Sequence, residues 1–291
     1  MDAKYIPPSS SVLKRMSTTP GLIIQRDIAI QIEQNEFVVI SPWEDSEETW
    51  RGKVTEIRLS ESQKAWVQIQ WLYSARDTRN ISWIGGRLSD SHQKAVSSLG
   101  THEYLISDHF DWVSSEALLG PCEILHYNDM PGCSPFEVSP KALFYRFSLV
   151  TTRKHPKLRG LTYHCLCKSV YDPEKDRQRY CSSCSAWYHE RCMKKAPAGL
   201  DSGVDPALNG LSHVLLASPI VRGGENRSIR DTRSWEMAGS GQALRNLAHF
   251  LNHGGCLDPN WAASMGGEEF FQTLLTLGKV AYLCPSCEES I

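Results

Sequence analysis

Residues 68–78, QIQWLYSARDT, alternate polar and apolar side chains and then enter a polar turn, a pattern that is typical of a β-strand. Trp71 and Tyr73 stand two positions apart, so we expect both rings on one face of that strand. The rings either pack in the core of a β domain or stand open to hold a ligand. For an arbitrary pair of aromatic residues at this spacing, core packing is the better starting interpretation.

The sequence around this segment repeats the same short-period pattern. Short runs rich in Val, Ile and Trp alternate with polar turns: GLIIQRDIAIQI, EFVVISPW, TWRGKVTEIRL, HEYLISDHFDWV and FYRFSLVTT. This pattern predicts a small antiparallel barrel or sandwich over residues 25–152. Residues 1–24 are rich in Ser, Pro and Thr, which predicts a disordered tail.

Composition narrows the class of protein. The chain has 291 residues, enough for two domains, and a formal net charge of −2, which disfavours a general nucleic-acid binder. It has no apolar run of membrane-spanning length, and its N-terminal segment lacks the apolar centre of a signal peptide. We therefore expect an intracellular protein without membrane association, in which the ten cysteines are not a disulfide framework.

The cysteines predict metal binding by the second half of the chain, residues 161–291. Eight Cys and His residues form the close pairs C-x-C, C-x2-C, H-x2-C and C-x2-C. They are Cys165, Cys167, Cys181, Cys184, His189, Cys192, Cys284 and Cys287. Eight such ligands fill two closed tetrahedral zinc sites, and the zinc would be structural because no coordination position stays open for catalysis. Disulfides and a catalytic thiol are the weaker interpretations.

The ligand order resembles the PHD finger, with His189 in fifth place and Trp187 two residues before it. This resemblance implies a cross-brace: Cys165, Cys167, His189 and Cys192 would bind one zinc, and Cys181, Cys184, Cys284 and Cys287 the other. A RING-type ubiquitin ligase usually has its histidine in fourth place. Residues 193–283 separate the last two pairs, so we expect a helical insertion at about 197–276, from SGQALRNLAHFLNH and GGEEFFQTLLTL. The basic segment 153–160 is expected to be a linker.

The PHD resemblance also implies contact with the histone H3 tail, with methylated lysine 4 as a candidate mark. Trp187 matches one wall of the family's aromatic cage, and Tyr171 is a candidate second wall. Asp172, Glu174 and Asp176 are candidate contacts to basic tail residues. Packing of Trp187 within the finger is an equally strong interpretation.

The β half resembles the bromo-adjacent homology (BAH) domain, through its W-x-Y strand end and the motif SDHFD. The order BAH then PHD is similar to the BAH–PHD chromatin readers of plants and fungi, which read trimethylated lysine 27 of histone H3. By position, Trp50, Trp71 and Tyr73 would form the methyl-lysine cage, with Trp50 where relatives commonly have Tyr. His109 and Asp111 would grip the peptide.

The patterns predict a mainly β protein, and the resemblances imply a non-enzymatic nuclear protein that binds the H3 tail on the nucleosome and acts in Polycomb-type repression. No nucleophile elbow, phosphate loop or HExxH motif is present in the sequence. The alternatives are a RING-like or PHD-type ubiquitin ligase, and a scaffold whose zinc finger is purely structural and whose insertion docks corepressor proteins. Sequence-specific DNA binding is not expected.

Overall fold

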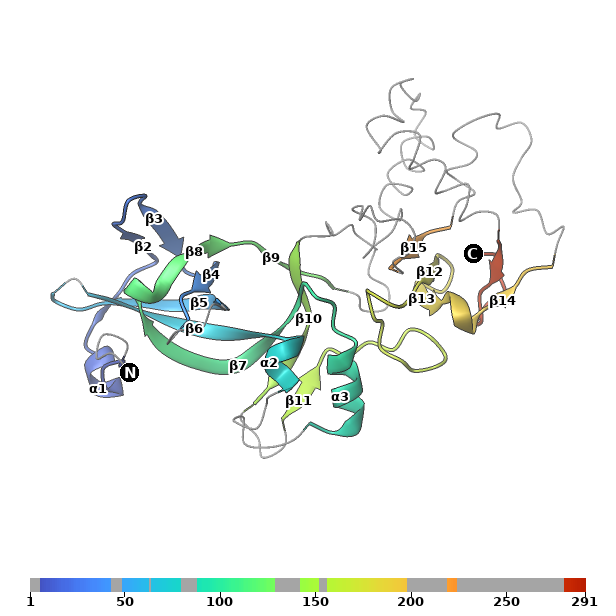
Figure 1. Cartoon of the computed structure of the whole chain (residues 1–291), viewed down its shortest axis with the longest axis horizontal. Helices are drawn as coiled ribbons and strands as arrows, with labels where there is room; N and C mark the ends of the chain where they lie inside the picture. The colour runs from blue at the N-terminus through green and yellow to red at the C-terminus, as the bar shows by residue number, and fades with distance from the viewer. Residues whose placement is uncertain are drawn as a thin grey trace, which may run out of the picture. The chain divides into compact units, whose positions relative to one another are not determined.

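The computed structural model describes residues 6–42, 49–62, 64–79, 88–128, 142–151, 156–197, 219–223 and 280–291. The chain divides into two compact units, Met1–Tyr127 with Ala142–Leu161, and Asn128–Lys141 with Thr162–Ile291 (Figure 1). The predicted helices of the insertion at 197–276 lie outside the described residues, as do residues 153–155 of the predicted linker. None of the described helices is long and apolar enough to cross a membrane.

The first unit is built on strands, as its alternating pattern predicted. They are β1 (Ser17–Thr18), β2 (Gly21–Ile24), β3 (Ile30–Glu33), β4 (Phe37–Ile40), β5 (Trp50–Leu59), β6 (Ala65–Ser74), β7 (Glu103–Ser114), β8 (Leu118–Cys122), β9 (Ile124–His126), β10 (Leu143–Val150) and β11 (Lys157–Arg159). Nine of them form one sheet with the path β11-β10-β7-β6-β5-β4-β8, with β1 paired to β5 and β9 to β10. A separate hairpin joins β2 and β3. The predicted mainly β class is confirmed.

The core of this unit lies along the central strands β5, β6 and β7. Val54, Val67, Ile69 and Leu105 are essentially inaccessible to solvent, and all come from these strands. Register shifts interrupt several of the pairings, including that of β6 with β7 between Gln70 and Leu72. Most of the pairings are antiparallel, as predicted, but β10 runs parallel to both β7 and β9.

Residues 6–24 differ from the predicted disordered tail. They form a short helix, α1 (Ser10–Leu13), and then β1, which pairs with β5 through Ser17 and Thr18. Leu13 is buried, and its carbonyl oxygen accepts a hydrogen bond from Arg58. These contacts with a distant strand order the segment despite its Ser- and Pro-rich composition, which predicts only the local preference.

A buried ion pair ties β7 to β10. Glu103 accepts two hydrogen bonds from Arg146, Nε to Oε1 at 2.7 Å and Nη2 to Oε2 at 2.8 Å, and both side chains are at most 1% exposed. The Glu103 carboxylate also accepts from the Gly100 amide. Two charges can be buried at this depth because bidentate geometry and the extra donor replace the lost water.

Two helices, α2 (Ala75–Arg79) and α3 (Asp90–Ser97), complete the unit, with a 3-10 turn, η3 (Ser115–Ala117).

The second unit has little regular structure in its described part. Its elements are β12 (Gln178–Cys181), β13 (Ala186–His189), the 3-10 turn η4 (Glu190–Cys192), β14 (Lys194–Lys195), β15 (Val221–Arg222) and β16 (Tyr282–Leu283). They form a three-stranded sheet in the order β13-β12-β15 and a two-stranded sheet of β14 and β16. The apolar cluster around them is small and consists largely of cysteines, together with Tyr188 and Met193. Among the described residues, cysteines thus make up much of this cluster, as expected where metal binding contributes to folding.

Candidate metal centres and aromatic sites

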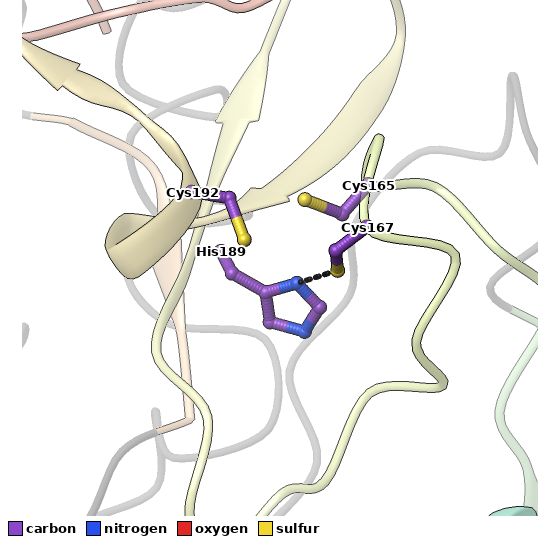
Figure 2. Close-up of side chains that lie close together, drawn as sticks. All are labelled: Cys165, Cys167, His189 and Cys192. Atoms are coloured by element: carbon purple, nitrogen blue, oxygen red, sulfur yellow. Dashed lines mark hydrogen bonds between the residues drawn. The ribbon is translucent and has the colours of Figure 1, made fainter.

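The structure brings the eight predicted ligands into two groups of four, with the predicted partition. Cys165, Cys167, His189 and Cys192 form the first group, and their ligand atoms all lie within 4.8 Å of one another. Figure 2 shows the four side chains converging on one point, with His189 Nδ1 3.4 Å from Cys167 Sγ. Local structure positions them. The first two cysteines lie on the loop before β12, His189 ends β13, and Cys192 ends η4.

The second group is assembled from parts of the chain about a hundred residues apart. It contains Cys181, Cys184, Cys284 and Cys287, again with all ligand atoms within 4.8 Å. Cys181 and Cys287 have their sulfurs 3.5 Å apart, and Cys184 and Cys284 3.7 Å. Both separations are far longer than a disulfide bond of about 2.05 Å.

Strands β14 and β16 explain how the remote cysteine pair returns to the finger. Lys194 pairs with Leu283 and Lys195 with Tyr282, so the chain just after Cys192 runs antiparallel to the chain just before Cys284. Arg179 on β12 adds a second link, since its guanidinium lies 4.5 Å from the Tyr282 ring centroid. The 193–283 insertion therefore begins and ends at neighbouring strands.

The donor sets fit zinc. Four ligands at about 2.3 Å from a tetrahedral ion lie about 3.8 Å apart, close to the observed sulfur separations. Burial opposes ionisation of Cys165, but hydrogen bonds with His189 and Cys167 lower the pKa of its thiol to about 6. In the second group burial likewise opposes ionisation of Cys284, and hydrogen bonds from Cys287 and Ser286 lower its pKa to about 7. Burial raises the pKa of the Cys192 thiol in the first group and of the Cys181 thiol in the second, so these two would be held as thiolates only by a bound cation.

Asp176 orients a ligand, a role that the sequence patterns did not predict. Its Oδ2 lies 3.1 Å from His189 Nε2, and it also accepts hydrogen bonds from the Asp172 amide and from Arg191. Burial alone would raise the pKa of Asp176, but these bonds lower it to about 2. An ionised carboxylate on the far nitrogen of a ligating histidine fixes its ring and tautomer. This use of a buried side chain argues against the predicted peptide contact.

The other two acidic candidates lie in the same loop. Asp172 is 8% exposed, and its Oδ1 accepts hydrogen bonds from the backbone amides of Glu174 and Lys175. Its Oδ2 accepts from Lys175 Nζ at 2.8 Å. Asp172 therefore shapes the loop, and of the three acidic residues only Glu174 is exposed.

Tyr171 and Trp187, the candidate cage walls of the finger, do come together. Both rings contact the Arg222 guanidinium, whose Cζ lies over the Tyr171 ring at 4.1 Å from its centroid and over the Trp187 ring at 4.4 Å. Both rings are at most 3% exposed, and Arg222 is fully buried. Both ring faces are thus contacted by a side chain of the same protein. The sequence patterns did not single out Arg222, because it lies within the insertion.

The predicted cage of the first unit lies where β5 and β6 run side by side. Trp50 begins β5, and its ring centroid is 6.1 Å from that of Trp71, with the planes at 74°. Gly52 pairs directly with Trp71, and a Cβ at that position would collide with the Ile69 side chain. Glycine therefore permits the close strand approach that sets Trp50 beside Trp71.

The three rings differ in exposure. Trp50 is 36% exposed, whereas Trp71 is 7% and Tyr73 2% exposed. Burial of the β6 pair agrees with the core-packing interpretation, and only Trp50 presents a large face to solvent. Burial, together with the Asp111 and Asp77 carboxylates, raises the pKa of Tyr73 far above its usual range, so its hydroxyl stays protonated.

His109 and Asp111 contact the same aromatic pair. The Tyr73 hydroxyl lies 2.6 Å from His109 Nδ1, and the Trp71 indole donates to Asp111 Oδ2 at 2.8 Å. His109 Nε2 is in turn 3.1 Å from that oxygen. In the pairing of β6 with β7 the register shifts here, so that the one residue Trp71 stands opposite three residues of β7, among them His109. The five predicted residues therefore form one continuous cluster.

Comparison with known proteins relates the chain to chromatin proteins. No protein-family model matches it. Two proteins of Arabidopsis thaliana are similar: Chromatin remodeling protein SHL, 25% identical over 163 residues, and Chromatin remodeling protein EBS, 22% identical over 162 residues. Each alignment covers 56% of this chain but 64% of SHL and 62% of EBS, so it spans less than two thirds of either relative.

A solved structure, that of the yeast Rsc2 BAH domain, is similar over 56% of this chain and 65% of that chain. Its sequence identity is 13% and its TM-score 0.36. The relationship to chromatin proteins therefore depends on the two sequence relatives.

Proposed function

From its relationship to the BAH-type chromatin readers, we propose that this chain is a non-enzymatic reader of histone tails. Its first unit would bind histone H3 trimethylated on lysine 27, and its second unit, a zinc finger of the PHD type, would contact the same tail. Such a protein would work in the nucleus, on nucleosomes, in transcriptional repression. Corepressors that bind the insertion are a further part of this proposal.

One observation carries the proposal for the first unit: three aromatic side chains and two polar ones gather at one place on β5, β6 and β7. They are Trp50, Trp71, Tyr73, His109 and Asp111. A trimethylammonium group has no N–H donor, so hydrogen bonds cannot select it. Aromatic faces attract its charge and cover its methyl groups together, at about 0.5–2 kcal/mol per face.

In the proposed pocket Trp50 is the movable wall. It is the exposed ring of the three, and it meets Trp71 edge to face. Rotation of the Trp50 side chain would uncover the Trp71 face while Asp111 holds the indole in place. His109 and Asp111, with side chains 35% and 45% exposed, offer polar partners to the peptide backbone beside the methylated lysine.

The zinc finger would hold two structural zinc ions, one in each group of four ligands. When bound, each ion cross-links segments that are distant in sequence and so stabilises the fold. In the first group Asp176 and Gln178 both contact His189 Nε2, whereas Nδ1 faces Cys167, so Nδ1 is the nitrogen available to the metal.

Titration of the intact chain with H3 peptides tests this function. We expect binding of the peptide trimethylated on lysine 27 and much weaker binding of the unmodified peptide. A peptide in which a neutral tert-butyl group replaces the trimethylammonium keeps the shape but removes the charge. It should bind less tightly, because the aromatic faces then lose their electrostatic partner.

The matched variants are Trp71→Ala and Phe110→Ala. Trp71 lies within the cluster, whereas Phe110 is an aromatic residue on β7 that is 44% exposed. Trp71→Ala should abolish selectivity for the trimethylated peptide, and Phe110→Ala should preserve it. Unchanged lysine-27 binding in a folded Trp71→Ala protein would refute the cage.

A further inference from the structure

Arg222 is bound by the finger in the way that a separate cationic ligand would be. Its guanidinium carbon lies over the Tyr171 ring and over the Trp187 ring, at 4.1 and 4.4 Å from their centroids. Its Nε donates a hydrogen bond of 2.9 Å to Gln178 Oε1. Two aromatic faces and an acceptor for an N–H group form a site that recognises the guanidinium specifically.

The backbone around Arg222 is also held by the finger, through pairing with strand β12. Strand β15 pairs antiparallel with β12, Arg222 opposite Gln178 and Val221 opposite Arg179, and the Tyr180 amide donates to the Ile220 carbonyl at 2.9 Å. Among the described residues β15 is the last strand on that side of the sheet, so without it β12 would be an open edge. Addition of an extended segment to an open strand edge is a common mode of peptide recognition.

Gly223 shows how closely the segment fits. Its φ is +66°, and a Cβ there would collide with the Tyr171 hydroxyl and the Asp176 carbonyl oxygen. The Tyr171 side chain therefore contacts both Arg222 and the residue after it. A position of this kind requires glycine, because any other side chain would force the segment away from the finger.

We propose that residues 219–223 are an internal ligand of this zinc finger: they occupy a binding site, here called the groove, made of the β12 edge and the Tyr171 and Trp187 rings, whose preferred occupant is an extended segment with an arginine. An external tail can enter the groove only after this segment leaves it. The finger is therefore closed in the structure described here. The competing occupant, the H3 tail, rests on the proposed function; the groove and its arginine preference do not.

Two variants open the groove by different routes. Arg222→Ala removes the guanidinium, and Gly223→Ala keeps it but blocks docking of the segment. Arg159→Ala is the matched control, since Arg159 is an exposed residue at the end of β11 in the other unit. The first measurement is binding of a synthetic peptide with the sequence of residues 219–223, PIVRG, at millimolar concentration, followed by fluorescence of Trp187 and its neighbours.

We expect both opening variants to bind the PIVRG peptide saturably and to ignore its PIVAG counterpart, while the Arg159→Ala protein binds neither. No saturable binding of PIVRG by variants that retain their zinc and their melting temperature would overturn the proposal. Loss of zinc and of cooperative melting in both variants would also overturn it, because Arg222 would then be a structural part of the finger.

The second measurement adds the histone. An unmodified or lysine-4-methylated peptide from the start of H3 should bind the opened variants about tenfold or more tightly than it binds the wild-type chain, because the closed population no longer competes. PIVRG should compete for that binding. Peptides around lysine 27 should bind all variants equally, because their proposed site is in the other unit. Failure of lysine-27 binding alone would count against the proposed function, not against the internal ligand.

Discussion

Trp71 and Asp111 are joined by a hydrogen bond of 2.8 Å from the indole Nε1 to Oδ2. His109 bridges this pair to Tyr73, because its Nε2 is 3.1 Å from the same Asp111 oxygen and its Nδ1 is 2.6 Å from the Tyr73 hydroxyl. Each polar candidate on β7 therefore holds one aromatic candidate on β6. A change at His109 or Asp111 should therefore also disturb the position of a ring, and with it the binding of a methylated lysine.

Asp111→Ala should weaken binding of the lysine-27-trimethylated peptide by about tenfold, because the loss of a hydrogen bond to a charged acceptor typically costs about 1.5–3 kcal/mol. Asp111→Asn keeps an oxygen acceptor for the indole and should therefore lose less affinity for the peptide than Asp111→Ala. Isothermal titration measures both. Asp27→Ala, at an exposed acidic position between β2 and β3, is the control and should bind as the wild type does.

Trp50→Ala should weaken the same binding by about 2- to 30-fold, the equivalent of one aromatic face. Because Trp50 is 36% exposed, the melting temperature of the first unit should change little. Trp50→Tyr should retain most of the affinity, since a tyrosine ring also offers a π face. A Trp50→Ala protein that binds at full affinity would show that the pocket does not include this ring.

The Glu103–Arg146 pair predicts a non-additive effect on stability. Glu103→Leu alone leaves the Arg146 charge buried without its partner and should lower the free energy of unfolding by about 3–5 kcal/mol. The double variant Glu103→Leu, Arg146→Met removes both charges and should recover most of that loss. Urea unfolding of the four proteins completes a double-mutant cycle. Equal stability of the single and double variants would contradict the expectation.

Metal analysis should find two zinc ions per chain. Cys284→Ser should reduce the content toward one, because the second group loses a thiolate. Cys122→Ser, at a cysteine of β8 in the other unit, should retain two. A chelator should abolish the folding transition of the second unit and leave that of the first, which has an apolar core of its own. Retention of both transitions after complete zinc removal would refute a structural role.

Some features were predictable because they depend on local order along the chain. The two-residue period of QIQWLY and its neighbours predicted strands, since alternate side chains of a strand share a face. Close Cys and His pairs predicted metal binding, since a tight turn aims two donors at one ion. The division of the eight ligands into two groups came from the PHD resemblance, and the structure groups them in the same way.

Other features were not predictable because they depend on contacts between distant segments. Composition made residues 1–24 look disordered, yet Leu13 is buried and β1 pairs with β5. Asp176 was expected at the surface as a peptide contact, but it lies 3.1 Å from His189 and orients that ring. In neither case does the local sequence contain the partner that decides the outcome.

The sequence by itself determined the mainly β class and the eight Cys and His residues that the structure gathers as possible metal ligands. Periodicity and spacing are enough for these, because each is a property of a few neighbouring residues. Only the tertiary structure decided that Trp71 and Tyr73 are largely buried, and that Arg222 contacts both Tyr171 and Trp187. The exposure of a side chain, and the identity of the residue that contacts it, depend on which distant segments of the chain pack together. A local sequence pattern does not contain that information.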